Sequence, residues 1–215
     1  NTTLTNMFNN TTALTNSFNT YPGFASTPQL TFFVDDIPNN DFSTLVTDWF
    51  NNPQNAKFTD ATNNPYYGQL PFWETGLVTN MSNAFDSRST FNEYLYWDVT
   101  NVTNMSYMFK LASSFNQDIG NWNTLNVKSM DRMFHSALNF NQPIGDWNVS
   151  NVTTMHDMFY DSGFNQDIGQ WNVSNVTSMY GLFNASSFTQ DISGWNVEKV
   201  EIMYNMFKNT YFNNP

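Results

Sequence analysis

All seven tryptophans of the chain recur at one interval of 24 or 25 residues. They are Trp49, Trp73, Trp97, Trp122, Trp147, Trp171 and Trp195. A fixed period in this range is typical of stacked repeats, in which each unit buries its apolar side chains against its neighbours. The spacing therefore predicts one elongated repeat domain, in which the indole side chains form a structural ladder from one coil to the next.

A second aromatic column follows the same period. Its most regular members are Phe115, Phe140, Phe164 and Phe188. From Val78 onward each repeat also carries Val-x-x-Met, followed four residues later by Phe, whereas the motif is degenerate before that point. We therefore expect degenerate N-terminal coils over residues 1–77, continuous with a regular repeat over residues 78–215.

The repeat contains two local patterns. Met105–Ala112 has apolar residues at i, i+3, i+4 and i+7, which predicts a short helix. Phe115–Ile119 alternates apolar and polar residues, which predicts a strand. Gly120, Gly145 and Gly169 follow the strand position and are expected at corners with positive φ. The expected fold is a leucine-rich-repeat-like solenoid of about nine coils, with short parallel strands stacked in a ladder and a short helical turn per coil.

Composition and charge argue against several classes of function. The formal net charge is −11 with seven Lys and Arg and no basic run, so we expect no nucleic-acid partner. The chain has no cysteine, and no apolar run reaches the length of a membrane-spanning helix. His135 and His156 stand at different repeat positions, away from any serine-and-acid or second-histidine arrangement. We therefore expect no catalytic residue, no metal site, no cofactor and no enzyme activity.

Sequons for N-glycosylation are abundant. The repeat spells Asn-Val-Ser-Asn-Val-Thr, so many of them arise without any role as glycan acceptors. If the chain passes through a glycosylating secretory route, covalent glycans are expected at exposed corners. The candidates are Asn1, Asn9, Asn10, Asn80, Asn101, Asn104, Asn148, Asn151, Asn172, Asn175 and Asn184.

The repeat motif is long enough to compare with a known family. Residues 102–123 read Val-Thr-Asn-Met-Ser-Tyr-Met-Phe-Lys-Leu-Ala-Ser-Ser-Phe-Asn-Gln-Asp-Ile-Gly-Asn-Trp-Asn. The motif resembles the BspA-like leucine-rich-repeat surface proteins, in the Met-Phe, Phe-Asn-Gln-Asp-Ile and Trp-Asn-Val variant catalogued as a domain of unknown function. The specific resemblance covers about residues 78–212. It implies a secreted or cell-surface protein with roles in adhesion and protein interaction and without catalytic residues.

Three functional hypotheses follow. The leading one is a non-enzymatic extracellular or cell-surface protein acting in adhesion or protein interaction, because a repeat surface offers a long regular face to a partner. The alternative is a filament subunit that assembles head to tail through incomplete end coils, whose strand edges template pairing. The lesser alternative is a glycan- or ice-binding face built from Thr103, Thr153 and Thr177, a column that Lys128 and Glu201 interrupt.

Overall fold

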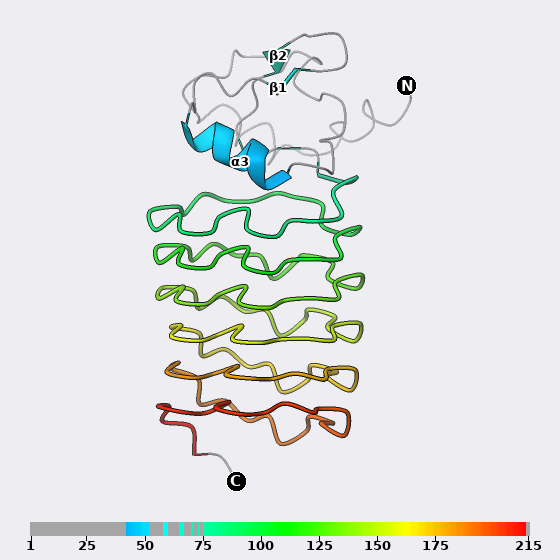
Figure 1. Cartoon of the computed structure of the whole chain (residues 1–215), viewed down its shortest axis with the longest axis vertical. Helices are drawn as coiled ribbons and strands as arrows, with labels where there is room; N and C mark the ends of the chain where they lie inside the picture. The colour runs from blue at the N-terminus through cyan, green and yellow to red at the C-terminus, as the bar shows by residue number, and fades with distance from the viewer. Residues whose placement is uncertain are drawn as a thin grey trace, which may run out of the picture. The chain divides into compact units, whose positions relative to one another are not determined.

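The computed structural model describes residues 42–51, 58–59, 65–66, 70, 73 and 75–213. The chain divides into two units, Asn1–Val34 and Asp35–Pro215, and all described residues lie in the second. The described elements are helix α3 (Phe42–Asn51) and strands β1 (Phe58–Thr59) and β2 (Pro65–Tyr66), shown in Figure 1. The two strands pair antiparallel, with Phe58 opposite Tyr66 and Thr59 opposite Pro65.

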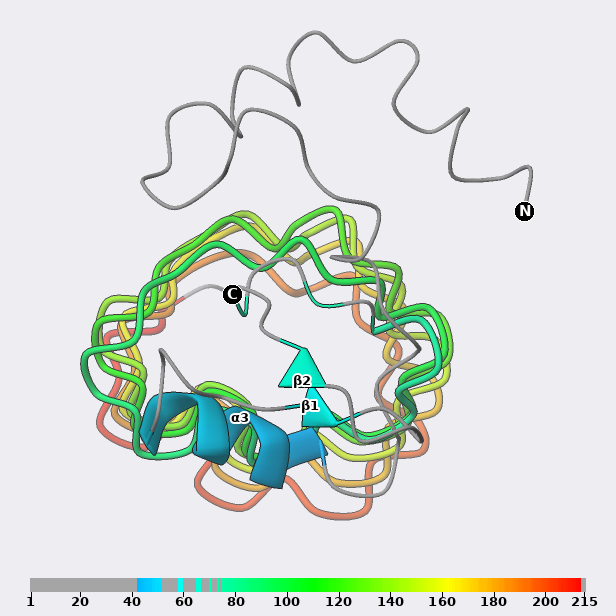
Figure 2. The ribbon, with the colours of Figure 1, turned by 90° about the horizontal axis from the view of Figure 1, so that it is seen from above.

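Successive repeats stack in register. Figure 1 shows the coils one above the next, and in Figure 2 they superpose when seen from above. One position joins neighbouring coils by isolated parallel bridges: Asn80 to Asn104, Asn104 to Ser129, Ser129 to Thr154, Thr154 to Ser178, and Ser178 to Ile202. The period of the sequence is therefore the length of one coil.

The expected fold class, a leucine-rich-repeat-like solenoid of stacked strands and short helical turns, is wrong. Within residues 75–213 the structure contains neither a helix nor a strand, only tight turns, isolated bridges and irregular backbone. The one described helix, α3, precedes the regular repeats, and the two described strands are two residues long each.

Backbone hydrogen bonding explains why Met105–Ala112 is not a helix. The N–H groups of Met108 and Ala112 donate to carbonyls three residues earlier, which closes turns. The N–H groups of Tyr107 and Leu111 donate instead to Asp131 and His135 in the next coil, both at 2.8 Å. Both residues have positive φ, 62° and 58°, as the third residue of a type II turn requires. Two such turns bury the same four side chains as a helix would, so the apolar spacing matched a helix that does not form.

Side-chain amides replace a strand ladder at Phe115–Ile119. The N–H of Asn116 donates to the Asn92 side-chain oxygen at 2.9 Å, and the Gln117 side chain donates to the Asn92 carbonyl at 2.9 Å. In the next coil, Asn141 and Gln142 make the equivalent bonds back to Asn116. Because side chains bridge the coils here, the alternating residues do not pair as strands.

The corner glycines are needed for space rather than for positive φ. Among the described glycines only Gly181 has a positive φ, so the expectation for Gly120, Gly145 and Gly169 is wrong. A Cβ at these three positions would lie 2.5–2.8 Å from a carbonyl oxygen of the next coil. No real Cβ contact is that short, so these corners admit only glycine without movement of the neighbouring coil.

Helix α3 packs on the first fully described coil, residues 81–104. Its apolar residues recur at helical spacing: Phe42, Leu45, Val46, Trp49 and Phe50. The Phe42 ring meets Trp97 edge-on at 5.1 Å, and Phe50 meets Phe91 edge-on at 5.7 Å. This helix therefore buries its apolar face against the aromatic columns of the repeat.

Candidate functional site

Aligning the coils separates constant positions from variable ones. In the four coils that begin at Met105, Met130, Met155 and Met179, the third, fourth and seventh side chains after that methionine are buried, as in Met108, Phe109 and Ala112. The first, second, fifth and sixth positions change from coil to coil, for example from Ser106, Tyr107, Lys110 and Leu111 to Asp131, Arg132, His135 and Ser136. We call the side chains at these four positions, with Arg88 and the exposed Leu138, the variable face.

The variable face concentrates the charge diversity of the repeat region. It carries four cations and four carboxylates: Arg88, Lys110, Arg132 and Lys208, and Asp86, Asp131, Asp157 and Asp161. It also carries both histidines of the chain. The remainder of residues 75–213 has two lysines against eight acidic residues. The variable face is thus a charge-balanced surface on an otherwise acidic repeat.

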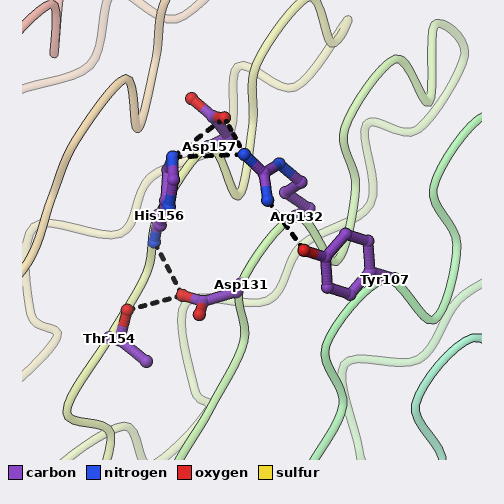
Figure 3. Close-up of polar contacts among 6 residues, drawn as sticks. All are labelled: Tyr107, Asp131, Arg132, Thr154, His156 and Asp157. Atoms are coloured by element: carbon purple, nitrogen blue, oxygen red, sulfur yellow. Dashed lines mark hydrogen bonds and ion pairs between the residues drawn. The ribbon is translucent and has the colours of Figure 1, made fainter.

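A network of polar side chains occupies the middle of this face (Figure 3). The Arg132 guanidinium lies 3.1 Å from the Asp157 carboxylate and donates to the Tyr107 hydroxyl at 2.7 Å. His156 Nε2 lies 3.1 Å from the same Asp157 oxygen and 3.4 Å from Arg132. Burial alone lowers the pKa of Arg132, but Tyr107 and Asp157 outweigh burial and raise it above its ordinary value. The network therefore joins three consecutive coils.

Asp131 anchors the turn that holds His156. One Asp131 oxygen accepts from the Thr154 hydroxyl at 2.6 Å and from the His156 backbone N–H at 2.9 Å. Because both donors lie in the next coil, this carboxylate fixes the backbone of the His156 turn rather than its ring.

Asp157 is the most buried charged residue of the face, at 7% exposed. One oxygen faces Arg132 and His156, while the other is buried without a hydrogen-bond partner among the described residues. This second oxygen lies over Gly181, where a Cβ would overlap it. Gly181 also has φ of 58°, so both the backbone conformation and the room taken by the Asp157 side chain favour glycine at position 181.

The His135 ring makes an aromatic contact on the variable face. Its ring stacks on Tyr160 of the next coil, with centroids 4.5 Å apart and planes 8° apart. Its Nδ1 atom is buried and has no hydrogen-bond partner among the described residues. Burial, the largest influence, lowers the pKa of His135, and Arg132 and Lys110 add to this. His135 is therefore held as a neutral ring at neutral pH.

Leu111 is the least expected residue of the face. It has φ of 58° and is 41% exposed, although a left-handed backbone favours Gly, Asn or Asp. Asn83, Asn205 and Asn209 follow that preference at equivalent turn positions, whereas Ser87, Ser136 and Ala185 do not but have small side chains. Leu138 in the next coil is 53% exposed. The face thus displays two leucines, one of them in a strained conformation.

Sequence reasoning missed the variable face. It treated His135 and His156 as unrelated because they stand at different repeat positions, but both lie on this face in adjacent coils. Writing the repeats one below another shows which positions vary, and this signal was available from the sequence. The side-chain pairing across coils was not, since it depends on the register of the stack.

The aromatic residues named from the period lie in the interior, except Trp49, which is half-buried. The pairs Trp73–Trp97, Trp122–Trp147 and Trp171–Trp195 are stacked at 6.2–6.5 Å. Phe115, Phe140, Phe164 and Phe188 follow one another at 5.9–6.2 Å. Trp49 lies in helix α3 and contacts Phe50 edge-on at 5.1 Å. The indole N–H groups of Trp97, Trp147, Trp171 and Trp195 donate to a carbonyl 27 or 28 residues earlier.

Three sequon asparagines serve as donors between coils. The Nδ2 groups of Asn101, Asn151 and Asn175 donate to carbonyl oxygens of the preceding coil, each at 2.8 Å. Asn184 is buried, at 9% exposed. A glycan on any of these nitrogens would replace a hydrogen used in packing or would need buried space.

The other described sequon asparagines use their side-chain oxygens. Asn80, Asn104, Asn148 and Asn172 accept the backbone N–H of the serine two residues later. Asn148 and Asn172 are exposed. A glycan on their nitrogen leaves these turns intact. Asn1, Asn9 and Asn10 lie outside the described residues.

The threonine and aspartate columns have local structural contacts. The hydroxyls of Thr103, Thr153 and Thr177 donate to carbonyls of the preceding coil at 3.1–3.2 Å. Asp118, Asp167 and Asp191 each accept the N–H two residues later. The Ser193 N–H lowers the pKa of Asp191 in this way.

Two features are absent from the described residues. No group of three or more His, Cys, Asp or Glu residues there is arranged to hold a metal ion. None of the helices within this part of the chain has the length and apolar character needed to cross a membrane.

Comparison with known proteins gives the family. A family model described as Mycoplasma protein of unknown function, DUF285, matches residues 52–163 and residues 144–215. Comparisons with curated proteins and with solved structures gave no match. Because the two matched ranges together span residues 52–215, more than half of the chain, it belongs to the family described as Mycoplasma protein of unknown function, DUF285.

Proposed function

We propose that this chain is a non-enzymatic binding protein of the cell surface or extracellular space, which contacts a protein partner through the variable face. The observation that carries the proposal is Leu111, an exposed apolar side chain held at a positive φ. The sixth position has positive φ in every described coil, but elsewhere it holds Ser, Asp, Ala or Asn, so only Leu111 places a large apolar side chain there. A surface leucine in this conformation contributes little to folding, so contact with a partner is the role that explains it.

The construction of the face supports the same function. Its backbone is fixed by hydrogen bonds to the next coil, including the Leu111 N–H to the His135 carbonyl at 2.8 Å. No two coils carry the same set of four side chains on this face, whereas the Phe and Trp positions of the columns are the same. A rigid surface of varied residues suits specific recognition, because little side-chain and loop ordering is lost on binding.

The location is proposed from the resemblance to BspA-like surface proteins. The family assignment supports this resemblance in its coarser form, since the DUF285 match spans the repeats that carry the motif. Adhesion is the corresponding proposed role. Covalent glycans, where the producing cell adds them, are proposed at Asn148 and Asn172, because both are exposed and keep their turn bonds.

A double variant tests the proposal. Leu111→Asn with Leu138→Ser removes both exposed leucines and places at position 111 a residue that tolerates positive φ. The labelled chain is applied to an array of purified secreted and cell-surface proteins and to a glycan array. We expect a protein ligand whose binding the double variant weakens at least about tenfold, a loss of about 1.4 kcal/mol.

The control variant lies outside the variable face. Asp146→Asn and Gln170→Ala change two exposed corner residues without altering the leucines, and we expect unchanged binding. Binding that survives loss of both leucines, or that responds equally to the corner variant, contradicts the proposed surface. A signal confined to the glycan array contradicts the proposed partner class.

Head-to-tail assembly is our second candidate function. Coils are joined with one polarity along part of the repeat, since Met179, Gly181 and Phe183 donate their N–H groups to the coil that follows. A second copy of the chain supplies coils of the same polarity, and repeated contacts of this kind grow a fibre. Sedimentation over a concentration series tests it, and a monomer at every concentration removes this candidate.

A further inference from the structure

We propose that mild acid weakens partner binding, because a proton taken up by His135 loosens the part of the variable face that holds Leu111. This inference rests on the proposed binding function and assigns a regulation to that same surface. The inference depends on the surroundings of His135 in the stack and not only on its being a histidine.

The His135 ring lacks the surroundings that a charged imidazole needs. A protonated imidazole donates from both ring nitrogens, but Nδ1 is buried without a hydrogen-bond partner among the described residues. The ring lies face to face with Tyr160 at 4.5 Å. Protonation would therefore leave an unpaired buried donor, which destabilises this arrangement.

The neighbouring charges do not offset that penalty. Arg132 in the same coil and Lys110 in the preceding coil oppose a positive charge at His135. Asp157 and Asp161 in the next coil favour it. Asp157, however, already faces Arg132 and His156, and one Asp161 oxygen accepts from the Ser136 hydroxyl at 3.2 Å. Burial is the largest influence and lowers the pKa of His135, so the neutral ring is the stable form.

A direct bond links His135 to the proposed contact residue. The His135 carbonyl accepts the Leu111 N–H at 2.8 Å, and the His135 N–H donates to the Arg132 carbonyl at 3.2 Å. The strained Leu111 backbone is therefore held in part by the turn that carries the histidine. Movement of that turn changes the presentation of Leu111.

The sign of the pH effect follows from the lowered pKa. Above the ordinary histidine value of 6.5 the ring is neutral in both folded and unfolded chains, and its full contribution to stability is present. As the pH falls below that value, the unfolded chain binds the proton before the folded chain does. The free energy of unfolding therefore falls progressively until the pH reaches the lowered pKa of His135 in the folded chain. The ordinary pKa of a carboxylate is about 4, which lies below the ordinary histidine value.

The test uses the purified full chain without a partner. Histidine and tyrosine ring resonances are followed by NMR, and the melting temperature is measured at about pH 7.5 and about pH 5.5, on either side of the ordinary histidine pKa. We expect His135 to titrate below 6.5, the Tyr160 resonances to move with the same midpoint, and the melting temperature to fall in acid.

Two substitutions of His135 separate its proton from its packing. His135→Phe keeps a ring on Tyr160, and His135→Asn introduces the residue that Asn184 provides at the same position two coils later. Both should abolish the Tyr160 midpoint and most of the difference in melting temperature. His156→Gln is the matched control and should retain both, because its ring faces Asp157 rather than the buried site.

The outcomes distinguish this inference from the proposed function. A His135 that titrates at or above 6.5, or a pH difference that both His135 variants retain, overturns the regulation and leaves binding by the leucines untouched. Failure of the arrays to give a protein ligand overturns the proposed function, while the proton-linked change in the isolated chain is still measured.

Discussion

The constant columns and the variable face occupy the same coils but use them differently. Phe109, Phe134 and Phe159 repeat one contact, with ring centroids 5.6–5.7 Å apart and nearly parallel. On the variable face each step differs, from the Lys110–Asp86 ion pair at 3.6 Å to the His135–Tyr160 stack. Repetition of one contact stabilises the stack, whereas variation of the contact gives each coil a distinct surface.

This comparison shows how one backbone serves both purposes. Hydrogen bonds from alternate N–H groups hold each coil to the next whatever the outward side chain is. A substitution on the face therefore alters what the surface presents, and a substitution in the columns alters whether the coils stack. The predictions below test that division.

The largest effect is expected in the Phe column. Phe134→Ala removes a fully buried ring that stacks on Phe109, Phe140 and Phe159, and should lower the free energy of unfolding by about 3–5 kcal/mol. Leu138→Ala on the variable face is the control, with an expected change within about 0.5 kcal/mol. Urea unfolding measures both, and similar losses would remove the distinction between columns and face.

A close backbone approach should give the next largest effect. A Cβ on Gly163 would overlap the Leu138 carbonyl oxygen, so Gly163→Ala should destabilise the chain by about 1–3 kcal/mol. Gly194→Ala is the matched control, because its Cβ would lie 3.7 Å from the nearest neighbouring atom, the Gly169 carbonyl oxygen. Equal melting temperatures for the two variants would show that contact between coils at Gly163 is unimportant.

Two tryptophans allow a smaller contrast within the columns. Trp147 donates to the Ile119 carbonyl at 3.0 Å, whereas the buried Trp122 N–H has no hydrogen-bond partner among the described residues. The Trp122→Phe and Trp147→Phe variants lose similar side-chain volume, but only Trp147→Phe also loses a hydrogen bond. Trp147→Phe should therefore be the less stable variant by about 1 kcal/mol. An equal loss in chemical denaturation would argue against a stabilising role for the indole bond.

The smallest effect is expected at Leu111 and has the opposite sign. Leu111→Asn relieves the strain of a branched apolar residue at φ of 58° and should raise the free energy of unfolding by about 0.5–1 kcal/mol. Leu125→Asn provides the comparison, because Leu125 is also exposed, at 43%, and is not among the described residues with positive φ. A destabilised Leu111→Asn would mean that the leucine serves folding rather than binding.

Sequence pattern predicted burial better than backbone conformation. The apolar spacing at Met105–Ala112 identified four side chains that are buried, but two turns rather than a helix bury them. The opposite case also occurs, because a helix forms where none was predicted. Helix α3 contains Phe42, Leu45 and Val46 at helical spacing, although the sequence predicted a degenerate coil for this stretch. Apolar periodicity reports which side chains face inward, and more than one backbone path satisfies it.

The sequence by itself determined the length of the coil, the family and the set of repeating aromatic side chains. Those properties follow from residues that recur every 24 or 25 positions, and this recurrence is visible in the sequence without a structure. Only the tertiary structure decided that alternate N–H groups would bond between coils, that Leu111 would take a positive φ, and that Arg132, His156 and Asp157 would meet. These contacts depend on how residues about one coil apart lie in register, and register is set by the packing of the whole stack.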